Sequence, residues 1–350
     1  MRSRVGELIT MRMQLLAGCA VIALCLVVFS SAAMADYSVH PKSANIVKTL
    51  VEQYGLSRAE VLAVLQKAQT EQRIIDSMAN AAEKTKTWSA YKKSFLVSAR
   101  LEQGVKFARQ YQSLLQQAEQ KYGVPAHVIT AVLGIETNYG GYTGKANVLN
   151  ALATLAFEHP RRGAFFQSEL IEYIALCAER NWQADQQLGS YAGAMGMAQF
   201  MPSNYRKLAV DGDGDGEVNL FTPADAIFSV ANYLAHHGWI GQAPVAVAAS
   251  YDHAKGIGDG VANSGLKPKH TLGDIQKAGV ALAQDARLSS LSPETDALLV
   301  DFDDADGREI YVGFENFYVL SRYNPRAKYA MVVHLLSEQI REQIDTAADV

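Results

Sequence analysis

The sequence has little cysteine, no excess of positive charge and none of the common cofactor or metal motifs. Three cysteines in 350 residues exclude a disulfide-stapled scaffold. The 32 basic and 36 acidic residues give a net charge of −4, which argues against nucleic acid as the main partner because phosphate binders usually show a basic face. The chain also lacks a glycine-rich phosphate loop, a Cys-x-x-Cys pair and a His-Glu-x-x-His motif. What is present, 49% hydrophobic and 19% charged residues, is the composition of a folded protein.

The first 35 residues have the pattern of a signal peptide. Three arginines precede an apolar run from Leu15 to Phe29, and Ala33–Ala35 ends the segment with small residues. These are the three parts of a secretory signal, so we expect residues 1–35 to be removed and the protein to be periplasmic. An uncleaved anchor is one alternative, although the run is shorter than the roughly 20 residues that cross a bilayer. Lipidation at the lipobox-like Leu16–Cys19 is another, but most of the apolar run follows that cysteine.

Without the signal peptide, Cys177 is the only cysteine and no internal disulfide can form. It lies in the apolar stretch Ile174–Ala178, so we predict a buried, unreactive thiol.

The pattern along the chain predicts a mainly α, α+β protein. Apolar residues recur at helical spacing through residues 40–120, and residues 163–180 and 222–238 are also predicted helices. Asp306-Gly307 between two valine- and isoleucine-containing runs predicts a β-hairpin. We therefore predict a helical N-terminal domain (36–120), a helical core (121–240), a small β-containing domain (241–313) and a C-terminal segment that returns to the core (314–350).

Glu136 is the first candidate catalytic residue. It ends an apolar helix that is expected to begin at Pro125, and glycines follow at 140 and 141. A carboxyl against an apolar wall is poorly solvated, which raises its pKa. A carboxylic acid that is still protonated near neutral pH can donate a proton to a leaving oxygen. A helix-terminal glutamate in solvent is the alternative.

The segment Gly189–Pro202 is the second candidate element, with three glycines, three alanines and almost no charge. Small side chains let a ligand or another backbone approach closely, so the segment is either a binding element or a site of tight helix packing. Ser190 and Gln199 are its polar exceptions. A serine-hydrolase assignment is weak because Ser190 lacks a Gly-x-Ser-x-Gly context.

An acidic loop is the third candidate. Asp211, Asp213 and Asp215 occupy positions 1, 3 and 5 of a loop with glycine at position 6, which matches the start of an EF-hand. Position 12 is Thr222, where a glutamate is usual, and the next carboxylate is Asp225 at position 15. Three clustered carboxylates repel one another without a cation, so Ca²⁺ is favoured over a solvated acidic turn.

The remaining candidates carry weaker signals. Arg161 and Arg162 could hold an acidic or carbonyl-bearing substrate by forked hydrogen bonds, although a surface pair is the alternative. His236 and His237 do not share a helix face, so we predict no zinc site there. Aromatics at helical spacing usually lie in the core. The aromatic residues that could instead stack on sugars are Trp88, Tyr91, Tyr139, Tyr233, Trp239, Tyr323 and Tyr329.

Together these motifs resemble the lytic murein transglycosylase B family. The resemblance implies a lysozyme-like fold, with a helical core that holds the active site, a helical domain and a small β domain. It implies cleavage of the β-1,4 bond between N-acetylmuramic acid and N-acetylglucosamine in peptidoglycan, with a 1,6-anhydro product. The matching pieces, between about residues 88 and 330, are Gly134–Thr137, Pro160–Arg162, Gly189–Pro202, the acidic loop, Ala231–Tyr233, Asn316–Tyr318 and Arg322–Asn324.

The resemblance also implies a role for each matching residue. Glu136 would be the single catalytic acid/base, Ser190 would steady the muramoyl sugar or its N-acetyl group, and Arg161 and Arg162 would face the peptide stem. The residues lining the glycan subsites would be Gln199, Tyr233, Tyr323, Asn324, Tyr329 and Tyr91. The Ca²⁺ ligands of an unusually long EF-hand loop, closed at position 15, would be Asp211, Asp213, Asp215, the backbone of Glu217, and Asp225.

A single glutamate can serve twice in such a reaction. It first protonates the glycosidic oxygen and then takes the proton of the sugar's own 6-hydroxyl as that oxygen closes on C1, an internal attack that high effective molarity favours. A water-using muramidase is one alternative and needs a second carboxylate, for which Glu158 is nearest in sequence. A catalytically silent peptidoglycan-binding or scaffolding module is another. The expected partners are glycan strands and proteins of cell-wall synthesis or remodelling, with the enzyme itself a monomer.

Overall fold

The computed structural model describes residues 36–79, 86–252, 256–257, 261–304 and 307–348. The predicted signal peptide, residues 1–35, lies outside the described residues. In those described ranges, no helix combines the length and apolar character needed to span a bilayer.

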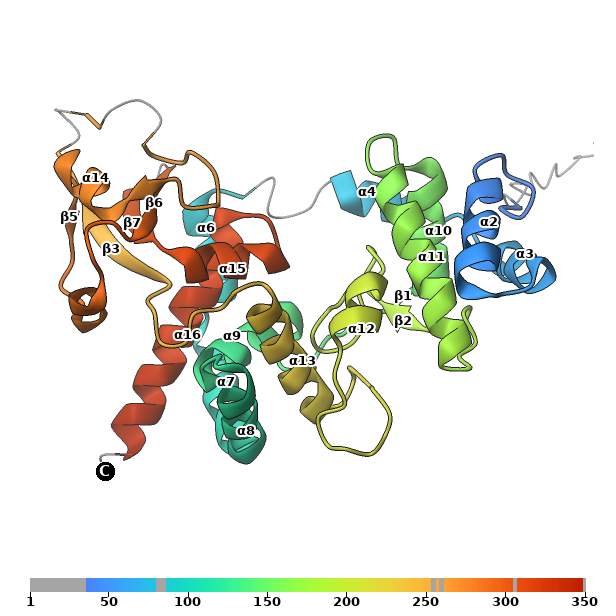
Figure 1. Cartoon of the computed structure of the whole chain (residues 1–350), viewed down its shortest axis with the longest axis horizontal. Coiled ribbons are helices and arrows are strands. Elements are labelled where there is room, and N and C mark those ends of the chain that lie inside the picture. The colour runs from blue at the N-terminus through green and yellow to red at the C-terminus, as the bar shows by residue number, and fades with distance from the viewer. Residues whose placement is uncertain (1–35, 80–85, 253–255, 258–260, 305–306, 349–350) are drawn as a thin grey trace, which may run out of the picture. The chain divides into compact units, whose positions relative to one another are not determined.

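An N-terminal group of helices packs on a long helical hairpin. Helices α10 and α11 are antiparallel neighbours, α4 contacts α10, α2 contacts α11, and α3 contacts α2 (Figure 1). Because α10 and α11 are apolar on nearly every side, they must be covered by other elements to be stable. The bounds are α2 (Ser43–Tyr54), α3 (Arg58–Lys67), α4 (Gln72–Ala79), α10 (Val148–Glu158) and α11 (Gly163–Glu179).

Helix α9 (Ala126–Thr137) is surrounded by four other helices, as its apolar sequence requires. Residues 128–135 are all buried. The preceding helix stops at Gly123, whose left-handed φ of 71° suits glycine, and Pro125 then stands directly before α9. The helices that contact α9 are α7 (Ser98–Gln110), α8 (Gln112–Tyr122), α13 (Pro223–His236) and α16 (Ala327–Ala348).

An antiparallel five-stranded sheet in the order β4-β6-β7-β3-β5 forms the β region. The predicted hairpin is confirmed, because β6 and β7 pair with Asp304 opposite Gly307. Helix α14 (Leu272–Lys277) packs on β6, and α6 (Trp88–Phe95) reaches the same strand through a stack of Trp88 on Phe302 at 4.2 Å. The strands are β3 (Ala246–Ser250), β4 (His270–Thr271), β5 (Ala281–Leu282), β6 (Asp296–Asp304) and β7 (Gly307–Gly313).

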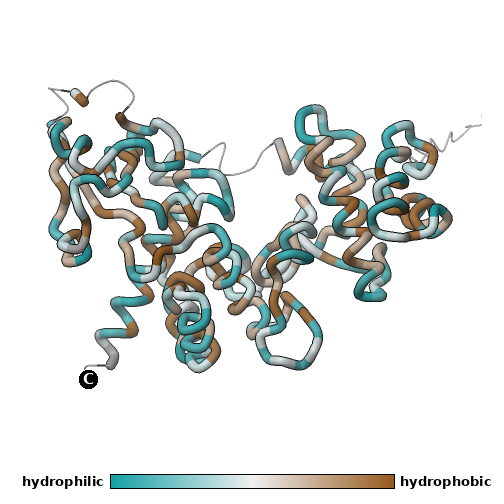
Figure 2. Tube along the Cα trace, viewed as in Figure 1, coloured by the Kyte–Doolittle hydropathy of each residue, from teal (hydrophilic) through white to brown (hydrophobic). Residues whose placement is uncertain are grey.

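The C-terminal helices return to α9 after the sheet. Helix α15 (Glu315–Tyr323) follows β7, and α16 contacts α15, α9, α7 and α6. Burial along α16 extends to Ile340, beyond which the last turns are largely hydrophilic (Figure 2). This return brings residues near position 329 beside a helix that lies almost 200 residues earlier in the chain.

Short elements fix the glycine- and alanine-rich segment. β1 (Ala146–Asn147) pairs with β2 (Leu188–Gly189) directly before this segment, and α12 (Pro202–Leu208) begins at its end. The mainly α class with a small β region is therefore confirmed, and so is the burial of Cys177, whose pKa burial raises to about 12. The division into domains stays a prediction.

Candidate active site

Glu136 lies in the last turn of α9, half-buried at the end of the apolar helix. The helix stops because Asn138 and Tyr139 both adopt left-handed φ angles of 51° and 59°, a conformation that side chains other than glycine rarely hold without support. The Tyr139 hydroxyl supplies that support by donating to the Arg100 carbonyl at 3.0 Å. Gly134 makes room for the ring, since a Cβ there would lie 2.5 Å from the Tyr139 oxygen. The chain therefore turns away sharply after the glutamate.

A tyrosine from the far end of the chain holds the glutamate. Tyr329, buried in the first turn of α16, donates its hydroxyl hydrogen to Oε1 of Glu136 at 2.5 Å. Its ring stacks on Tyr323, with centroids 6.3 Å apart and planes 15° from parallel. Tyr323 in turn donates to the Ala198 carbonyl at 2.7 Å, which ties the C-terminal helices to the segment 189–202.

Tyr233 completes a group that we call the tyrosine cluster: Tyr233, Tyr323 and Tyr329. The ring of Tyr233 lies 4.6 Å from that of Tyr323, and its hydroxyl donates to the Arg322 carbonyl at 2.7 Å. Burial raises the pKa of all three phenols, to about 12 for Tyr233, and the charge of Glu136 raises them further. The hydroxyls therefore remain protonated hydrogen-bond donors at any physiological pH.

The charge of Glu136 acts on the whole tyrosine cluster. Among the described residues, it is the only carboxylate whose charge contributes to the raised pKa values of Tyr233 and Tyr323. Glu158, the nearest second carboxylate in sequence, is the last residue of α10. Its charge instead raises the pKa of Tyr37 in the N-terminal helical group. The one acid suggested for a water-using mechanism therefore lies elsewhere.

The segment 189–202 holds its two polar side chains with backbone hydrogen bonds. Ser190 Oγ accepts from the Ala194 amide at 3.0 Å. Gln199, at a left-handed φ of 49°, donates from Nε2 to the carbonyls of Thr143 at 3.1 Å and Gly196 at 2.8 Å. Both side chains are half-buried and fixed in place, as binding residues in a preorganised site should be.

Thr137 joins this segment to the end of α9, a connection that the sequence reasoning missed. Its buried hydroxyl donates to the Met197 carbonyl at 2.9 Å and accepts from the Gly140 amide at 3.0 Å. It thereby sets the distance between the glutamate and the residues around Gln199. The available signal was a hydroxyl directly after the candidate acid, at the end of the apolar run 131–135.

Two further predicted residues lie near the cluster. Tyr91 is fully buried in α6, and its charge contributes to the raised pKa of Tyr329. It therefore forms part of the wall behind the acid rather than an exposed stacking surface. Asn324 is half-buried at the C-cap of α15, directly after Tyr323.

The arginine pair is not brought to the tyrosine cluster. Arg161 and Arg162 are exposed in the turn between α10 and α11, where the Arg162 guanidinium lies 4.5 Å from the Phe165 ring centroid. Helix α10 begins beside β2 and Ser190 and is roughly 16 Å long, so the turn that carries both arginines lies at the far end of this helix from Ser190.

The acidic loop gathers three of its carboxylates. Side-chain oxygens of Asp211, Asp213 and Asp225 lie within 4.8 Å of one another, whereas Asp215 and Glu217 are exposed and outside this group. Two oxygens on opposite sides of a Ca²⁺ ion stand about 4.6–5.2 Å apart, so the spacing fits this cation. Burial raises the pKa of Asp225, and the charges of Asp213 and Asp211 raise it further, which is the repulsion that a cation would relieve.

The loop is preorganised by its own backbone. Asp225 accepts from the amides of Gly212 at 2.8 Å and Asn219 at 2.5 Å, and Asp211 accepts from Gly214 at 2.6 Å and Gly216 at 2.9 Å. These bonds hold the first and last carboxylates of the long loop together.

Comparison with known proteins identifies the fold around this acid. The family model described as a transglycosylase SLT domain matches residues 38–338. The chain belongs to this transglycosylase family. This SLT-family chain is 35% identical over 314 residues to the membrane-bound lytic murein transglycosylase B of Escherichia coli strain K12, covering 87% of the chain and 84% of that relative. The expected family membership is therefore confirmed.

Solved structures of relatives confirm the lysozyme-like fold. Soluble lytic transglycosylase SltB1 from Pseudomonas aeruginosa superposes with a TM-score of 0.79 at 36% identity, over 87% of this chain and 100% of that one. The Escherichia coli lytic transglycosylase SLT35, solved in complex with calcium, gives 0.77 at 34% identity over 89% and 96%. SltB3 from Pseudomonas aeruginosa, solved with NAG-anhNAM-pentapeptide, gives 0.73 at 28% identity over 86% and 79%.

Proposed function

We propose that this protein is a lytic transglycosylase that cleaves the β-1,4 bond between N-acetylmuramic acid and N-acetylglucosamine of peptidoglycan, with Glu136 as its single acid/base. Membership of the transglycosylase family and relatives named as lytic transglycosylases support the activity. The observation that carries the assignment to Glu136 is one half-buried carboxylate that accepts a hydrogen bond from a buried tyrosine and whose charge raises the pKa of all three tyrosines of the cluster.

The chemistry needs one group that gives and then takes a proton. Glu136 gives its proton to the glycosidic oxygen as the C1–O bond breaks, which releases the N-acetylglucosamine side with a free hydroxyl. The resulting carboxylate takes the proton of the muramoyl 6-hydroxyl as O6 bonds to C1. Atoms balance without water. Because Tyr329 donates to Oε1, the proton to be transferred belongs on Oε2.

The residues around the glutamate support this sequence by holding the sugar. Ser190 and Gln199 lie on the segment that Thr137 fastens to the end of α9, so they can steady the muramoyl sugar at a fixed distance from the acid. Positioning of this kind is what raises the effective molarity of the internal 6-hydroxyl. The exposed Arg161 and Arg162 are proposed to meet the peptide stem beyond the cluster.

The decisive experiment is digestion of purified peptidoglycan followed by mass spectrometry of the released fragments. Glu136→Gln should lower turnover by at least about 10²–10⁴-fold while leaving the thermal transition unchanged. The wild-type fragments should carry anhydro ends, lighter by one water than hydrated ends. Glu169→Gln is the matched control, because Glu169 is a buried carboxylate that only holds Ser203 at 2.7 Å, and it should retain turnover. Fragments with hydrated ends alone would contradict the transglycosylase reaction and favour a muramidase.

We propose further that the acidic loop binds Ca²⁺ as a structural ion, through Asp211, Asp213 and Asp225, with Asp215 and the Glu217 carbonyl joining on binding. The spacing of the three carboxylates supports this, and a relative is described as a calcium complex. Calcium at 100 times its dissociation constant should stabilise the folded protein by about 2.7 kcal/mol. Thermal unfolding with EDTA and then with added calcium measures it. Asp225→Asn should abolish most of the shift and Asp215→Asn should reduce it less, and no shift in the wild type would remove the proposal.

The proposed substrate lies outside the cytoplasmic membrane, so we also propose that the protein is exported to the periplasm by residues 1–35. The basic, apolar and small-residue parts of that segment support export. The N-terminal sequence of the protein isolated from cells should then begin at Asp36, and a chain that still begins at Met1 would contradict cleavage.

A further inference from the structure

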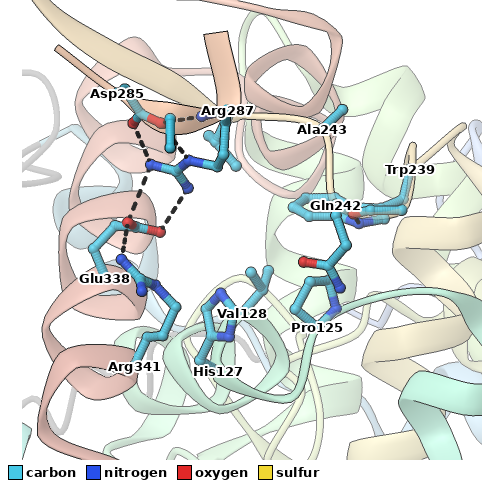
Figure 3. A pocket seen from close by; sticks show the side chains of 13 residues that line it. Pro125, His127, Val128, Trp239, Gln242, Ala243, Asp285, Arg287, Glu338 and Arg341 are labelled. Atoms are coloured by element: carbon cyan, nitrogen blue, oxygen red, sulfur yellow. Dashed lines mark hydrogen bonds and ion pairs between the residues drawn. The ribbon is translucent and has the colours of Figure 1, made fainter. Parts of the chain in front are cut away.

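A cavity lies at the opposite end of α9 from Glu136. It has a volume of about 410 Å³ and is lined by the first turn of α9, the loop after α13, the loop around residue 286 and the side of α16. Figure 3 shows His127 and Gln242 facing the side chains of Arg287 and Glu338 across it. His127 and Glu136 are nine residues apart on one helix, or roughly 14 Å, so the cavity does not belong to the tyrosine cluster.

One wall of the cavity is charged but balanced. The Arg287 guanidinium donates hydrogen bonds to Asp285 at 2.7 Å and to both carboxylate oxygens of Glu338 at 3.2 Å. Arg341 donates a further hydrogen bond to Glu338 at 3.0 Å. Two guanidinium groups thus face two carboxylates, as the dashed lines of Figure 3 show. An ionic ligand would have to separate these pairs and leave a charge uncompensated, which is strongly unfavourable in a partly buried site.

The opposite wall keeps hydrogen-bonding capacity that the protein does not use. The half-buried His127 imidazole makes no hydrogen bond within the described part of the chain. Burial lowers its pKa to about 4, so at neutral pH the ring has one N–H donor and one acceptor nitrogen. Gln242, on the exposed loop beside it, offers an amide with both kinds of atom, and its Nε2 has only a 3.5 Å contact with Glu119.

The floor of the cavity is apolar. The indole N–H of Trp239 is used by the Gly241 carbonyl at 2.9 Å, so what Trp239 presents to the cavity is ring carbon. Val128 lies beside it in the same lining. An aromatic surface opposite neutral donors and acceptors suits a ligand with one C–H face and several hydroxyl or amide groups.

We propose that this cavity is a second glycan site, which binds a neutral N-acetylhexosamine through Trp239, His127 and Gln242. The inference rests on the proposed function for its source of ligand, since a peptidoglycan strand supplies N-acetylglucosamine at every second position. The balanced charges select this sugar over the muramic acid, whose lactyl group carries a carboxylate in the unsubstituted form. The enzyme would thereby hold a neighbouring stretch of glycan on a surface remote from Glu136.

The test is fluorine NMR of the full protein labelled with 5-fluorotryptophan. The chain has three tryptophans, Trp88, Trp182 and Trp239, so three resonances are assigned by replacing each with phenylalanine. The protein also carries Glu136→Gln to prevent turnover, and the probe is tri-N-acetylchitotriose. The Trp239 resonance should shift and saturate. His127→Leu removes both ring nitrogens and should weaken this isotherm about 5–10-fold. His127→Asn, which keeps a donor and an acceptor, should restore it to within about twofold.

Two controls separate this site from the tyrosine cluster. Tyr323→Phe should leave the Trp239 isotherm unchanged, because Tyr323 lies at the other end of α9. Gln242 lies on an exposed loop, so Gln242→Leu should weaken the binding measured at the Trp239 resonance without affecting folding. This variant tests the site even if His127→Leu fails to fold.

Three outcomes overturn the inference: a Trp239 resonance that does not move with sugar, an isotherm that neither His127→Leu nor Gln242→Leu changes, or tighter binding of free N-acetylmuramic acid than of N-acetylglucosamine. None of these outcomes would contradict the proposed reaction, which is tested separately by the turnover of Glu136→Gln.

Discussion

The carboxylates at the two ends of α9 have different hydrogen-bond partners. At the C-terminal end, Glu136 accepts a hydrogen bond from the neutral hydroxyl of Tyr329. At the N-terminal end, the carboxylates of Asp285 and Glu338 are both bonded to the guanidinium of Arg287. Both ends are partly buried, so the difference lies in the neighbours rather than in exposure.

This difference in partners shows which surroundings let a carboxyl group act as an acid catalyst. The hydrogen bond from Arg287 lowers the pKa of Asp285, and for Glu338 the interactions with His334, Arg287 and Arg341 outweigh the effect of burial and lower its pKa as well. Such carboxylates remain ionised and cannot give a proton near neutral pH. A glutamate that must start protonated needs neighbours that hold it in place without supplying positive charge, and tyrosine hydroxyls do this.

Among variants that keep Glu136 itself, the largest effect should come from removing the Tyr329 hydroxyl that orients it. Tyr329→Phe keeps the buried ring and loses the 2.5 Å bond, so kcat should fall about 10–100-fold with KM changed little, which corresponds to about 1.5–3 kcal/mol for a bond to a charged group. Tyr323→Phe is the matched control, because its hydroxyl bonds a carbonyl and not the acid, and it should cost less in kcat. Equal losses in kcat for both variants would mean that Tyr329 acts only through packing.

A second prediction concerns the other end of α9, where buried histidines should make stability depend on acidity. Burial lowers the pKa of His334 to about 4, against 6.5 in the unfolded chain. The pKa of the same ring is raised by the charges of Glu338 and Asp285 and by a hydrogen bond with the Ala246 backbone, and it is lowered by the charge of Arg287. Between these two pKa values the unfolded chain binds more protons, so the free energy of unfolding should decrease as the pH falls from about 6.5 to about 4.

Urea unfolding at pH 7.0 and pH 4.5 measures this dependence. His334→Leu should reduce the loss of stability on acidification by about 1–2 kcal/mol relative to the wild type. Tyr329→Phe, at the other end of the helix, should leave the pH dependence unaltered. A His334→Leu protein with the wild-type pH dependence would show that the ring is already charged in the folded state, and the contrast between the two ends would be lost.

Local sequence predicted one side of the site well. The helix 126–137 and its end after Glu136 follow from an apolar run that stops at polar and glycine residues, and the hairpin of β6 and β7 follows from Asp306-Gly307. Both features depend on residues close in the chain, whose spacing and turn chemistry are visible in the sequence. The gathering of Asp211, Asp213 and Asp225 likewise follows from one loop closed by the first turn of α13.

What local sequence could not predict is the partner of the glutamate. Tyr329 is 193 residues away, and only the packing of α16 against α9 brings its hydroxyl to Oε1. The resemblance to a known family marked Tyr329 as a subsite residue but gave no bond between it and the acid. The position of Arg161 and Arg162 at the end of α10 that lies away from Ser190 likewise comes from the fold, and their role toward the peptide stem stays a prediction.

The smallest effect should come from Thr137, which couples the acid to the sugar-binding segment rather than touching the reacting atoms. Thr137→Val keeps the shape of the buried side chain but leaves the Met197 carbonyl and the Gly140 amide without this hydroxyl. The Gln199 region should then drift relative to Glu136, and kcat/KM should fall about 5–10-fold, with most of the loss in kcat because the bound sugar is misplaced.

Thr137→Ser separates positioning from stability, since it restores the hydroxyl and lacks only a methyl group. It should recover turnover to within about twofold of the wild type even if its thermal transition is lower, because the hydrogen bonds to Met197 and Gly140 are what set the geometry. If turnover in the two variants instead follows their melting temperatures, Thr137 contributes only to packing. The segment 189–202 would then be positioned by the bond of Tyr323 on α15 to Ala198 and by the bond of Gln199 to Thr143.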